Sequence, residues 1–485
     1  MAPNATEANL ATDIPVSEHA SKVRMIKWEE IRRHKSEDSP WLVINGKVYD
    51  VTEFQKRHPG GDMILLGAGR HSTELYLSHH PSYVLESKML DKYYIGDVEG
   101  EEQIHDKSKG VHHDLFTGMK AAHLYDPKSQ TDFYKVLRRR VEETLKKNGK
   151  KPRDDPEMYT KTVISLVVWF ILYYSIHFYF ENYFASLACA IVWGFANANI
   201  GMSVMHDGNH GGYSDSPVIN RIMGGMFDFL GGSSFVWKMI HSVGHHVHTN
   251  VQELDPDIHT AEPHFRRIKP IQHQRWWYRY QHIYLPVLYC VLLPELFIRD
   301  FVAMFKGSWG GVPFQPAPTR EWVIFWSTKA WFMIYLFVLP IWHCGSVMRV
   351  VSINLVALLI AGELLVLMFQ VNHVTEAAIS FNVNEKGIVE KDWAISQTEG
   401  SSNFAAGSWL WNHISGGLNH QTEHHLFPTI SHVHYPMLHP VVMKTCKEFG
   451  VKYNNYPSFW DAIKGHFKLL KDMGAQGIKY DYHVE

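Results

Sequence analysis

The sequence has few cysteines, almost no net charge and no apolar segment at its start. Its four cysteines lie far apart without a CxxC pair, which argues against a disulfide framework and a cysteine-based zinc site. A formal net charge of −2 over 485 residues gives no global attraction to nucleic acid, so we expect no such partner. The polar start predicts a disordered tail over residues 1–21 and no secretory signal peptide.

Long apolar runs occur in the later part of the chain, whereas residues 1–155 are polar and charged, a division that the mean hydropathy of −0.19 conceals. A membrane-spanning helix needs ~20 mostly apolar residues. Four runs approach or reach this length, and the last two carry one charge each, Lys329 and Glu363. The runs are 163–180, 184–205, 322–342 and 350–371. They predict four transmembrane helices rather than the buried core helices of a soluble protein.

Histidines are abundant, 32 in all, and several form three clusters beside the apolar runs. His206 and His210 are four residues apart, as are His241 and His245, so each pair shares one face of a helix. Further members of the clusters are His246, Gln421, His424 and His425. Neutral imidazoles suit iron, zinc or copper rather than magnesium or calcium. The clusters therefore predict a metal centre.

A single metal centre requires all three clusters on one side of the membrane. The first follows the second apolar run and the third follows the fourth run, so an even number of crossings separates them. Segment 283–302, which contains Pro286, Pro294, Glu295 and Arg299, would break this parity, and we expect it to lie in the interface. By the same argument segment 222–236 does not span. Positive charge over residues 135–153 places the N-terminal region in the cytosol with the clusters.

The N-terminal region has a second kind of histidine pattern. Residues 41–54 alternate and turn around Asn45-Gly46, which predicts a β-hairpin. His58 then begins the turn His-Pro-Gly-Gly, and the pair His79-His80 follows about twenty residues later. Two imidazoles from opposite sides of a slot can hold a haem with no open position, which suits electron transfer. The alternative is a histidine-capped turn without haem.

Residues 24–98 resemble the cytochrome b5 family, because Val-Tyr-Asp-Val-Thr-Glu-Phe precedes the His-Pro-Gly-Gly turn and Ser-Thr follows it at residues 72–73. The resemblance implies a small α+β haem domain over residues 22–100. The family's first axial ligand to haem b maps onto His58 and its second onto His80, just before Pro81. His79 is the alternative for the second ligand.

The three histidine clusters resemble the histidine boxes of the membrane fatty acid desaturases, over about Phe133 to Trp460. A third box that begins with Gln421, together with the haem domain, resembles the front-end branch, which inserts a double bond between an existing one and the carboxyl group. The resemblance implies an α-helical membrane domain over residues 156–460, with four transmembrane helices and a cytosolic diiron cap. A linker with a basic amphipathic helix (101–155) would precede it, and a C-terminal tail (461–485) would follow.

Two non-haem iron ions are implied by this resemblance, and we expect no catalytic residue beyond their ligands. The expected ligands are His206, His210, His241, His245, His246, His373, Gln421, His424 and His425. His373 matches an additional family histidine near the fourth span, and His420 is a further candidate because it forms an HxxxH pair with His424. Asp207, Asn209, Asn250, Asp255, Asp257 and Glu423 are expected to orient imidazoles or lie at the surface. Glu363 is expected beside the substrate tunnel or in an intramembrane hydrogen bond.

The resemblance implies an O2-dependent oxidoreductase that acts in polyunsaturated fatty acid biosynthesis. We expect it in the endoplasmic reticulum membrane. Its substrate would be a polyunsaturated acyl-CoA or acyl-phospholipid, and NADH-cytochrome b5 reductase would supply electrons through the fused haem. Segments 281–285 and 431–436 look closest to Δ5 and Δ4 desaturases, and we expect Δ5 desaturation of C20 acids, with Δ4, Δ6 and Δ8 as alternatives. A sphingolipid Δ8 desaturase and a lipid hydroxylase are rival enzymes. A membrane-anchored haem carrier would need no histidine boxes.

Overall fold

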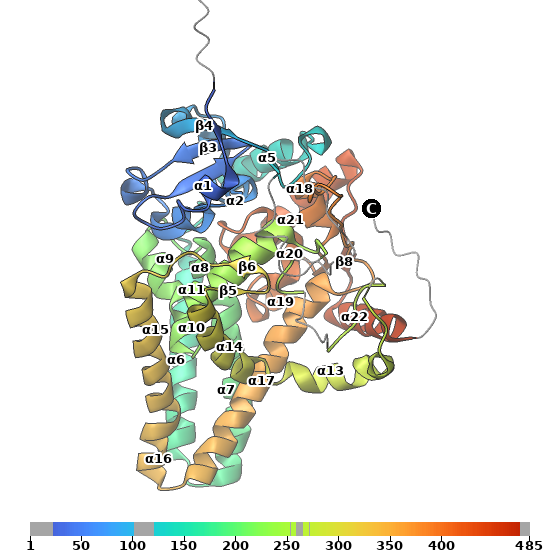
Figure 1. Ribbon diagram of the computed structural model, residues 1–485. Coiled ribbons are helices and arrows are strands. Elements are labelled where there is room, and N and C mark those ends of the chain that lie inside the picture. Colours follow the sequence, from blue (N-terminus) through green and yellow to red (C-terminus); the bar gives the residue numbers. More distant parts are fainter. Residues whose placement is uncertain (1–22, 101–120, 253, 259–264, 271, 476–485) are drawn as a thin grey trace, which may run out of the picture.

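The computed structural model describes residues 23–100, 121–252, 254–258, 265–270 and 272–475. The expected N-terminal tail therefore lies outside the described residues, as does the first part of the expected linker. Figure 1 shows the N-terminal domain above one end of a set of long helices, with the C-terminal helices beside it. The predicted combination of an α+β domain and a helical domain is confirmed.

The N-terminal domain is built on a four-stranded sheet with the order β1-β4-β3-β2. Strands β2 (Trp41–Ile44) and β3 (Lys47–Asp50) form the predicted hairpin. Its turn residues Asn45 and Gly46 have φ of 50° and 73°, the left-handed conformation that a two-residue hairpin requires. The remaining strands and the helices around the haem slot are β1 (Met25–Ile26), α1 (Trp28–Ile31), η1 (Gln55–Arg57), η2 (Gly61–Gly67), α2 (Thr73–His79), α3 (Ser82–Leu85), η3 (Met89–Tyr93) and β4 (Tyr94–Val98).

Four helices among the described residues are long and apolar enough to cross a membrane, as predicted. They are 156–179 (α6, Pro156–Tyr174, and η6, Ser175–Tyr179), 183–210 (α7, Tyr183–Ile200; η7, Gly201–Met205; α8, His206–His210), 319–344 (α15, Thr319–Met333; η10, Ile334–Val338; α16, Leu339–Cys344) and α17 (Val347–His373). The weaker segment forms two separate helices, α13 (Gln281–Tyr289) and α14 (Leu292–Lys306), and neither meets the same criteria. Segment 222–236 is likewise broken into short helices.

Close packing of α7 against α17 fixes the relative positions of the first and third histidine clusters. A Cβ atom at Gly194 would lie 2.8 Å from the carbonyl oxygen of Ala357, so a glycine is needed where the two backbones approach. Ala190 and Ala361 are fully buried. Small residues thus bring the ends of both helices to the same region of the protein.

The membrane helices carry a cap of shorter helices, into which the C-terminal region also packs. Besides α5 (Phe133–Lys147), the basic amphipathic helix, the cap contains α9 (Pro217–Gly224), α10 (Met226–Phe229), α11 (Ser234–Trp237), η8 (Lys238–His245), α12 (His246–His248), α18 (Trp393–Glu399), α19 (Trp409–Ile414), α20 (Gln421–Leu426), α21 (Tyr435–Phe449) and α22 (Phe459–Gly474). Helix α22 corrects the prediction of a tail from residue 461. It buries Ala462, His466 and Leu470, spaced four residues apart, and contacts α13 and α17.

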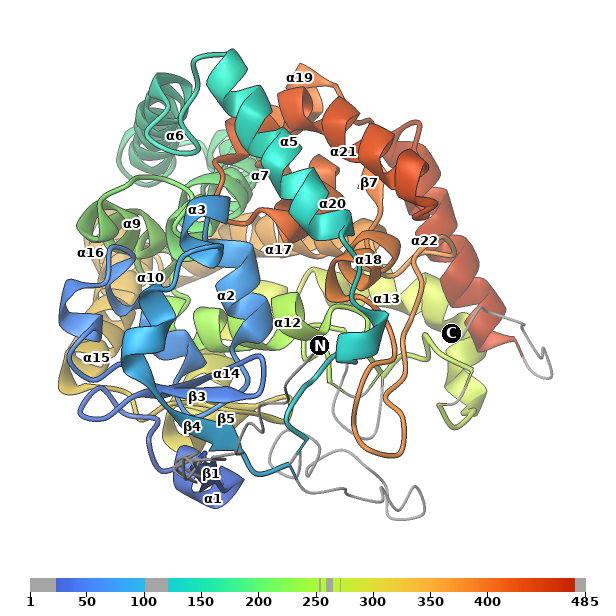
Figure 2. The same ribbon diagram turned by 90° about the horizontal axis from the view of Figure 1, so that it is seen from above.

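The haem domain docks directly on the cap. Leu66 and Leu75 share one apolar cluster with Val243 and Val247 of the segment that carries the second histidine cluster. Arg320 forms ion pairs with Asp62 (2.9 Å) and Glu37 (3.1 Å), and Arg221 pairs with Asp62 at 3.2 Å. Seen from above in Figure 2, α2 of the haem domain lies beside α12. The docking therefore brings the haem slot close to the second histidine cluster.

One charge of the third span is explained by a buried ion pair. Lys329 lies 2.8 Å from Asp300 of α14, and the two side chains are only 3% and 1% exposed. The ammonium also donates to the Gly231 carbonyl at 2.6 Å and lies against the ring of Phe297. Two buried charges are tolerated here because each is paired and hydrogen-bonded.

We predict that Lys329→Met lowers the free energy of unfolding by about 3–5 kcal/mol, because it leaves Asp300 buried without a partner. The double variant Lys329→Met/Asp300→Leu should regain most of this loss, since both charges are removed. Thermal unfolding of the purified protein in detergent, followed by tryptophan fluorescence, measures both effects. Lys306→Met, at an exposed position of α14, is the matched control. Equal unfolding temperatures for all variants would contradict the prediction.

Candidate metal centre and haem slot

The three histidine clusters meet at one buried place in the cap. His206 and His210 lie on α8, which continues the second span beyond a π-helical turn, and His373 ends α17. The other histidines come from η8, α12 and α20, namely His241, His245, His246, His424 and His425. All of these side chains are buried. Residues more than 200 positions apart in the sequence are thus brought together as the motifs predicted.

Two histidine groups can be distinguished by distance. In the first histidine group (His206, His210, His241, His424), one ligand nitrogen from each residue lies within 4.8 Å of the others. In the second histidine group (His245, His373, His425), the same limit holds, and the Nε2 atoms of His373 and His425 are 3.2 Å apart.

His246 connects the groups. Its Nε2 lies 3.2 Å from His241 Nε2 and 3.0 Å from His424 Nε2, and it also forms a set with His424 and His425. The arrangement therefore offers two adjacent places for a metal ion.

The nitrogens of the site fit a metal ion better than hydrogen bonds among themselves. Burial lowers the pKa of His246, His424 and His425 well below the usual value, and the neighbouring imidazoles lower it further, so these rings are neutral. A neutral ring whose Nδ1 carries the proton offers only a lone pair at Nε2. Both ring nitrogens of His210 and Nε2 of His245 are buried and have no hydrogen-bond partner among the residues that the structure describes. A nitrogen donor set of this kind suits iron, zinc or copper.

Carboxylates behind the imidazoles fix their orientation. The Nδ1 atom of His245 lies 3.0 Å from each carboxylate oxygen of Asp255, and His241 Nδ1 lies 2.8 Å from Asp257. Burial alone would lower the pKa of His245, but Asp255 raises it above the usual value. A partner at Nδ1 leaves Nε2 of each ring for the metal. Both aspartates thus have the orienting position expected from the sequence.

Other expected neighbours have different partners. Asp207 contacts the His432 ring at 2.9 Å, and Glu423 accepts a hydrogen bond from Tyr453 at 2.6 Å. Asn209 donates to the Gly224 carbonyl, and Asn250 to the carbonyls of His373 and Gly400. The two asparagines thus hold the backbone around the site, whereas the two acidic residues bind side chains outside the histidine groups. Sequence reasoning missed Gln397 and Thr249, which lie 2.9 and 3.1 Å from His425 Nδ1 and belong to no motif.

Gln421 lies at the edge of the second histidine group. Its amide nitrogen is 2.8 Å from His373 Nε2 and 3.0 Å from His425 Nε2, and its oxygen accepts a hydrogen bond from Asn372. In this orientation the amide presents donors, which do not bind a metal, so its role as a ligand stays a prediction. His420 accepts a hydrogen bond from the Gly407 amide and belongs to neither group.

An apolar hollow of about 40 Å³ lies between the membrane helices beside the first histidine group. Met205, which precedes His206, forms part of its wall together with Trp193, Leu293, Phe332 and Leu365. The chemistry of this wall suits a hydrocarbon chain. Glu363 is not part of the wall, and the thiol of Cys290 donates to its carboxylate at 3.4 Å.

The haem slot of the N-terminal domain places two imidazoles opposite each other. The ring centroids of His58 and His80 are 5.9 Å apart. Their Nδ1 atoms lie 3.2 and 3.0 Å from the carbonyls of Gly61 and Tyr76, which leaves both Nε2 atoms for an iron. The Nδ1 atom of His79 instead lies within hydrogen-bond distance of the Ser78 hydroxyl and the Leu75 carbonyl. Burial lowers the pKa of His80 to about 4, so the ring is neutral, as a ligand must be.

We predict that His80→Ala abolishes the absorption spectrum of a six-coordinate haem, because one axial imidazole is lost. His79→Ala is the matched control, since the proposed ligand is the adjacent His80, whose ring is the one in contact with His58, and it should keep the spectrum. Absorption of the purified protein in the oxidised and reduced states, with haem content per chain, measures both. Loss of the spectrum in His79→Ala and its retention in His80→Ala would reverse the assignment.

Comparison with known proteins agrees with both parts of the chain. The family described as fatty acid desaturase matches residues 181–457, and the cytochrome b5-like heme/steroid binding domain matches residues 27–99. An acyl-lipid (8-3)-desaturase of Physcomitrium patens is 42% identical over 455 residues, covering 93% of this chain and 92% of the relative. A probable Delta(5) fatty acid desaturase C of Dictyostelium discoideum is 35% identical over 464 residues, covering 93% and 95%. The chain therefore belongs to the fatty acid desaturase family, as a front-end member with a cytochrome b5 domain fused at its N-terminus.

Proposed function

We propose that this chain introduces a cis double bond into a long-chain polyunsaturated acyl chain, on the carboxyl side of the existing double bonds, with Δ5 desaturation of C20 acids as its reaction. The observation that carries the proposal is the pair of adjacent histidine groups, buried beneath a docked haem domain and beside an apolar hollow. The names of the relatives, an acyl-lipid (8-3)-desaturase and a Delta(5) desaturase, support the position of the new bond.

The two histidine groups would hold two non-haem iron ions. Bound there, the iron pair would supply, with dioxygen, the oxidising power that an unactivated methylene group requires. The ligands would be the residues named above, His206, His210, His241, His245, His246, His373, His424 and His425, with Gln421 at the edge of the second group. Each turnover removes two hydrogens from the substrate and takes two electrons and two protons, so that dioxygen leaves as two waters.

The protein positions the reactants around this centre. Asp255 and Asp257 hold two imidazoles in place, and burial of the whole cluster excludes bulk water from the reacting carbons. The apolar hollow beside Met205 would accept the methyl-terminal part of the acyl chain. Selectivity would then follow from how far the chain enters between the membrane helices.

Electrons would reach the centre from the docked haem domain. Helix α2 ends at His79, next to the proposed haem ligand His80, and contacts α12, which begins at His246. A tethered donor acts at a high effective concentration. We propose NADH-cytochrome b5 reductase as its reductant and the endoplasmic reticulum membrane as its location. The basic helix α5 before the first span supports a cytosolic position for the haem domain and the histidine groups.

We predict that Asp255→Asn lowers the affinity for iron about 10–100-fold, because His245 loses the carboxylate that fixes its ring. Iron bound per chain after dialysis against a weak chelator, measured beside the haem content, shows the loss. The control is Asp461→Asn. Asp461 lies in the first turn of α22 and accepts a hydrogen bond from Ser458, not from a residue of either histidine group. Unchanged iron retention in Asp255→Asn would contradict the proposed role of Asp255.

Expression in a yeast without polyunsaturated acids tests the reaction itself. Cells fed separately with C18, C20 and C22 polyenoic acids should form a new Δ5 bond in the C20 acids, located by mass spectrometry. His425→Ala should stop this reaction and retain the haem spectrum, whereas His273→Ala, at an exposed position, should not change it.

A new bond at Δ4, Δ6 or Δ8 would retain the front-end reaction and correct its position. If every fed acid were unchanged while long-chain bases gained a double bond or a hydroxyl group, a sphingolipid desaturase or a lipid hydroxylase would replace the proposal.

A further inference from the structure

Helix α5 contacts both the haem domain and the cap that holds the histidine groups. Seen from above in Figure 2, it runs between α3 of the haem domain and α21. Its buried face includes Tyr134 and Arg138, which are four residues apart and therefore lie on one side of the helix. A buried arginine requires partners for its charge and its N–H groups. The partners of this face lie at both proposed redox sites.

The Arg138 guanidinium reaches the haem domain. It donates a hydrogen bond to the carbonyl of Leu77 in α2, three residues before His80. A second link lies one turn further along α5, where the Glu142 carboxylate accepts a hydrogen bond from the Ser82 amide at 2.8 Å. Ser82 follows His80 by two residues. Helix α5 thus holds the chain on both sides of the proposed axial ligand.

The Tyr134 hydroxyl reaches the other site. It donates a hydrogen bond to the Leu426 carbonyl at 2.5 Å, and Leu426 directly follows His425 in α20. Burial raises the pKa of Tyr134, so the hydroxyl keeps its proton and acts as the donor. The Tyr134 ring also lies 5.3 Å from the ring of Trp393 in α18, which fixes its plane. The end of the third histidine cluster is therefore attached to α5.

Tyr134 and Arg138 also contact each other. The guanidinium carbon lies 4.2 Å from the centre of the Tyr134 ring, which is a cation–π contact. The two side chains are only 7% and 5% exposed, so little water weakens this contact. A continuous series of contacts therefore runs from the Leu77 carbonyl through Arg138 and Tyr134 to the Leu426 carbonyl.

We propose that Arg138 and Tyr134 are positioning residues that fix the haem ligand His80 relative to the metal ligand His425, and so set the rate of electron transfer between the two sites. The inference rests on the proposed function. The step moves one electron, so that ferrous haem is oxidised to ferric haem and the metal centre is reduced. Two such steps, each followed by reduction of the haem by the external reductase, supply the two electrons of one turnover. Because electron transfer slows steeply with distance, a small shift of α2 should lower its rate.

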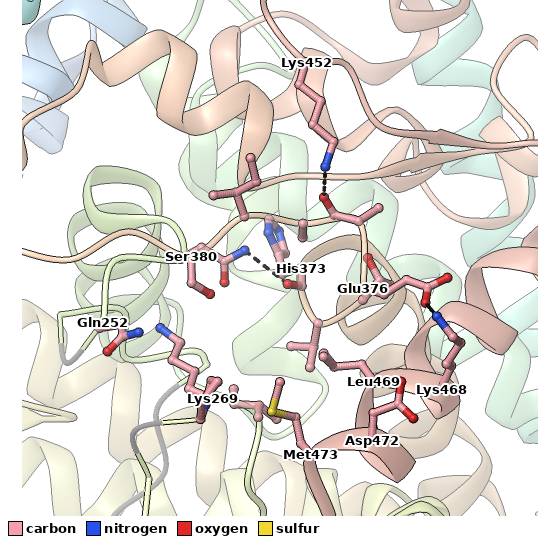
Figure 3. A pocket seen from close by; sticks show the side chains of 18 residues that line it. Gln252, Lys269, His373, Glu376, Ser380, Lys452, Lys468, Leu469, Asp472 and Met473 are labelled. Atoms are coloured by element: carbon pink, nitrogen blue, oxygen red, sulfur yellow. Dashed lines mark hydrogen bonds and ion pairs between the residues drawn. The ribbon is translucent and has the colours of Figure 1, made fainter. Parts of the chain in front are cut away.

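Substrate binding should not depend on this pair. A cavity of about 340 Å³ beside the end of α17 is lined by His373 and the segment that follows it (Figure 3), and the apolar hollow lies beside Met205. Neither Tyr134 nor Arg138 is among the described residues that line these two spaces. Loss of the contact series should therefore lower kcat and leave KM for the acyl substrate unchanged.

The test uses the purified full-length enzyme with its haem reduced, mixed with dioxygen and a C20 acid with double bonds at Δ8, Δ11 and Δ14, supplied on phosphatidylcholine or on coenzyme A. Haem reoxidation, followed by absorption in stopped flow, should be about tenfold slower in Arg138→Met, because a hydrogen bond from a charged donor no longer holds α2. Tyr134→Phe, which removes only the hydroxyl, should slow it as well. The double variant should be no slower than the slower single variant, since the two links act in series. Direct reoxidation by dioxygen is measured in His425→Ala.

Hydrogen exchange of residues 73–86 provides a second measurement that needs no turnover. It should rise in Arg138→Met while the haem spectrum and the iron content stay the same, because the segment around His80 is held less firmly. Lys135→Met is the matched control, since Lys135 is an exposed residue of the same helix. It should change neither the exchange nor the rate of reoxidation.

Unchanged reoxidation in Arg138→Met would overturn the inference, while a wild type that still desaturates keeps the proposed function. Slowing in the double variant that equals the product of the single effects would also overturn it, because the two contacts would then act independently. If Arg138→Met loses its haem or its fold, Tyr134→Phe decides, and unchanged reoxidation there overturns the inference. A wild type whose haem is reoxidised no faster than that of His425→Ala would instead reject the proposed function.

Discussion

The mutual approach of buried, neutral imidazoles is the constraint on which the rest of the structure depends. The Nε2 atom of His246 lies 3.2 Å from that of His241 and 3.0 Å from that of His424, and burial keeps His246 and His424 uncharged by lowering their pKa. Lone pairs at such distances, away from water, are costly unless a cation lies between them. Several features of the fold hold these imidazoles close together. Asp255 and Asp257 orient two rings, and the small residues between α7 and α17 bring helices from different parts of the chain to one place.

The haem domain, the metal centre and the two cavities form one continuous arrangement. Arg221 and Arg320 hold the haem domain through Asp62, and the apolar contact of Leu75 with the segment of Val247 places α2 against α12. Below this contact lie the histidine groups, with one cavity beside His373 and an apolar hollow beside Met205. The docked N-terminal domain and the cavity beside His373 thus border the same buried cluster.

Local patterns in the sequence were sufficient for the four long helices, the hairpin at Asn45-Gly46 and the convergence of the histidine clusters. Partners far apart in the sequence were not predictable. Gln397 and Thr249 reach His425 from 28 and 176 residues away, and the Arg221–Asp62 pair spans 159 residues. Such pairings depend on tertiary packing and have no local periodicity. Helix α22 was missed for a related reason, since its buried face contacts α13 and α17, which no motif connects to it.

Quantification of iron in the purified full-length chain, beside its haem content, tests the central claim most directly. If the two histidine groups hold the proposed iron pair, the protein should contain about two non-haem iron ions for each haem, and desaturation should scale with their occupancy. A preparation that desaturates fully with haem as its only iron would contradict the account.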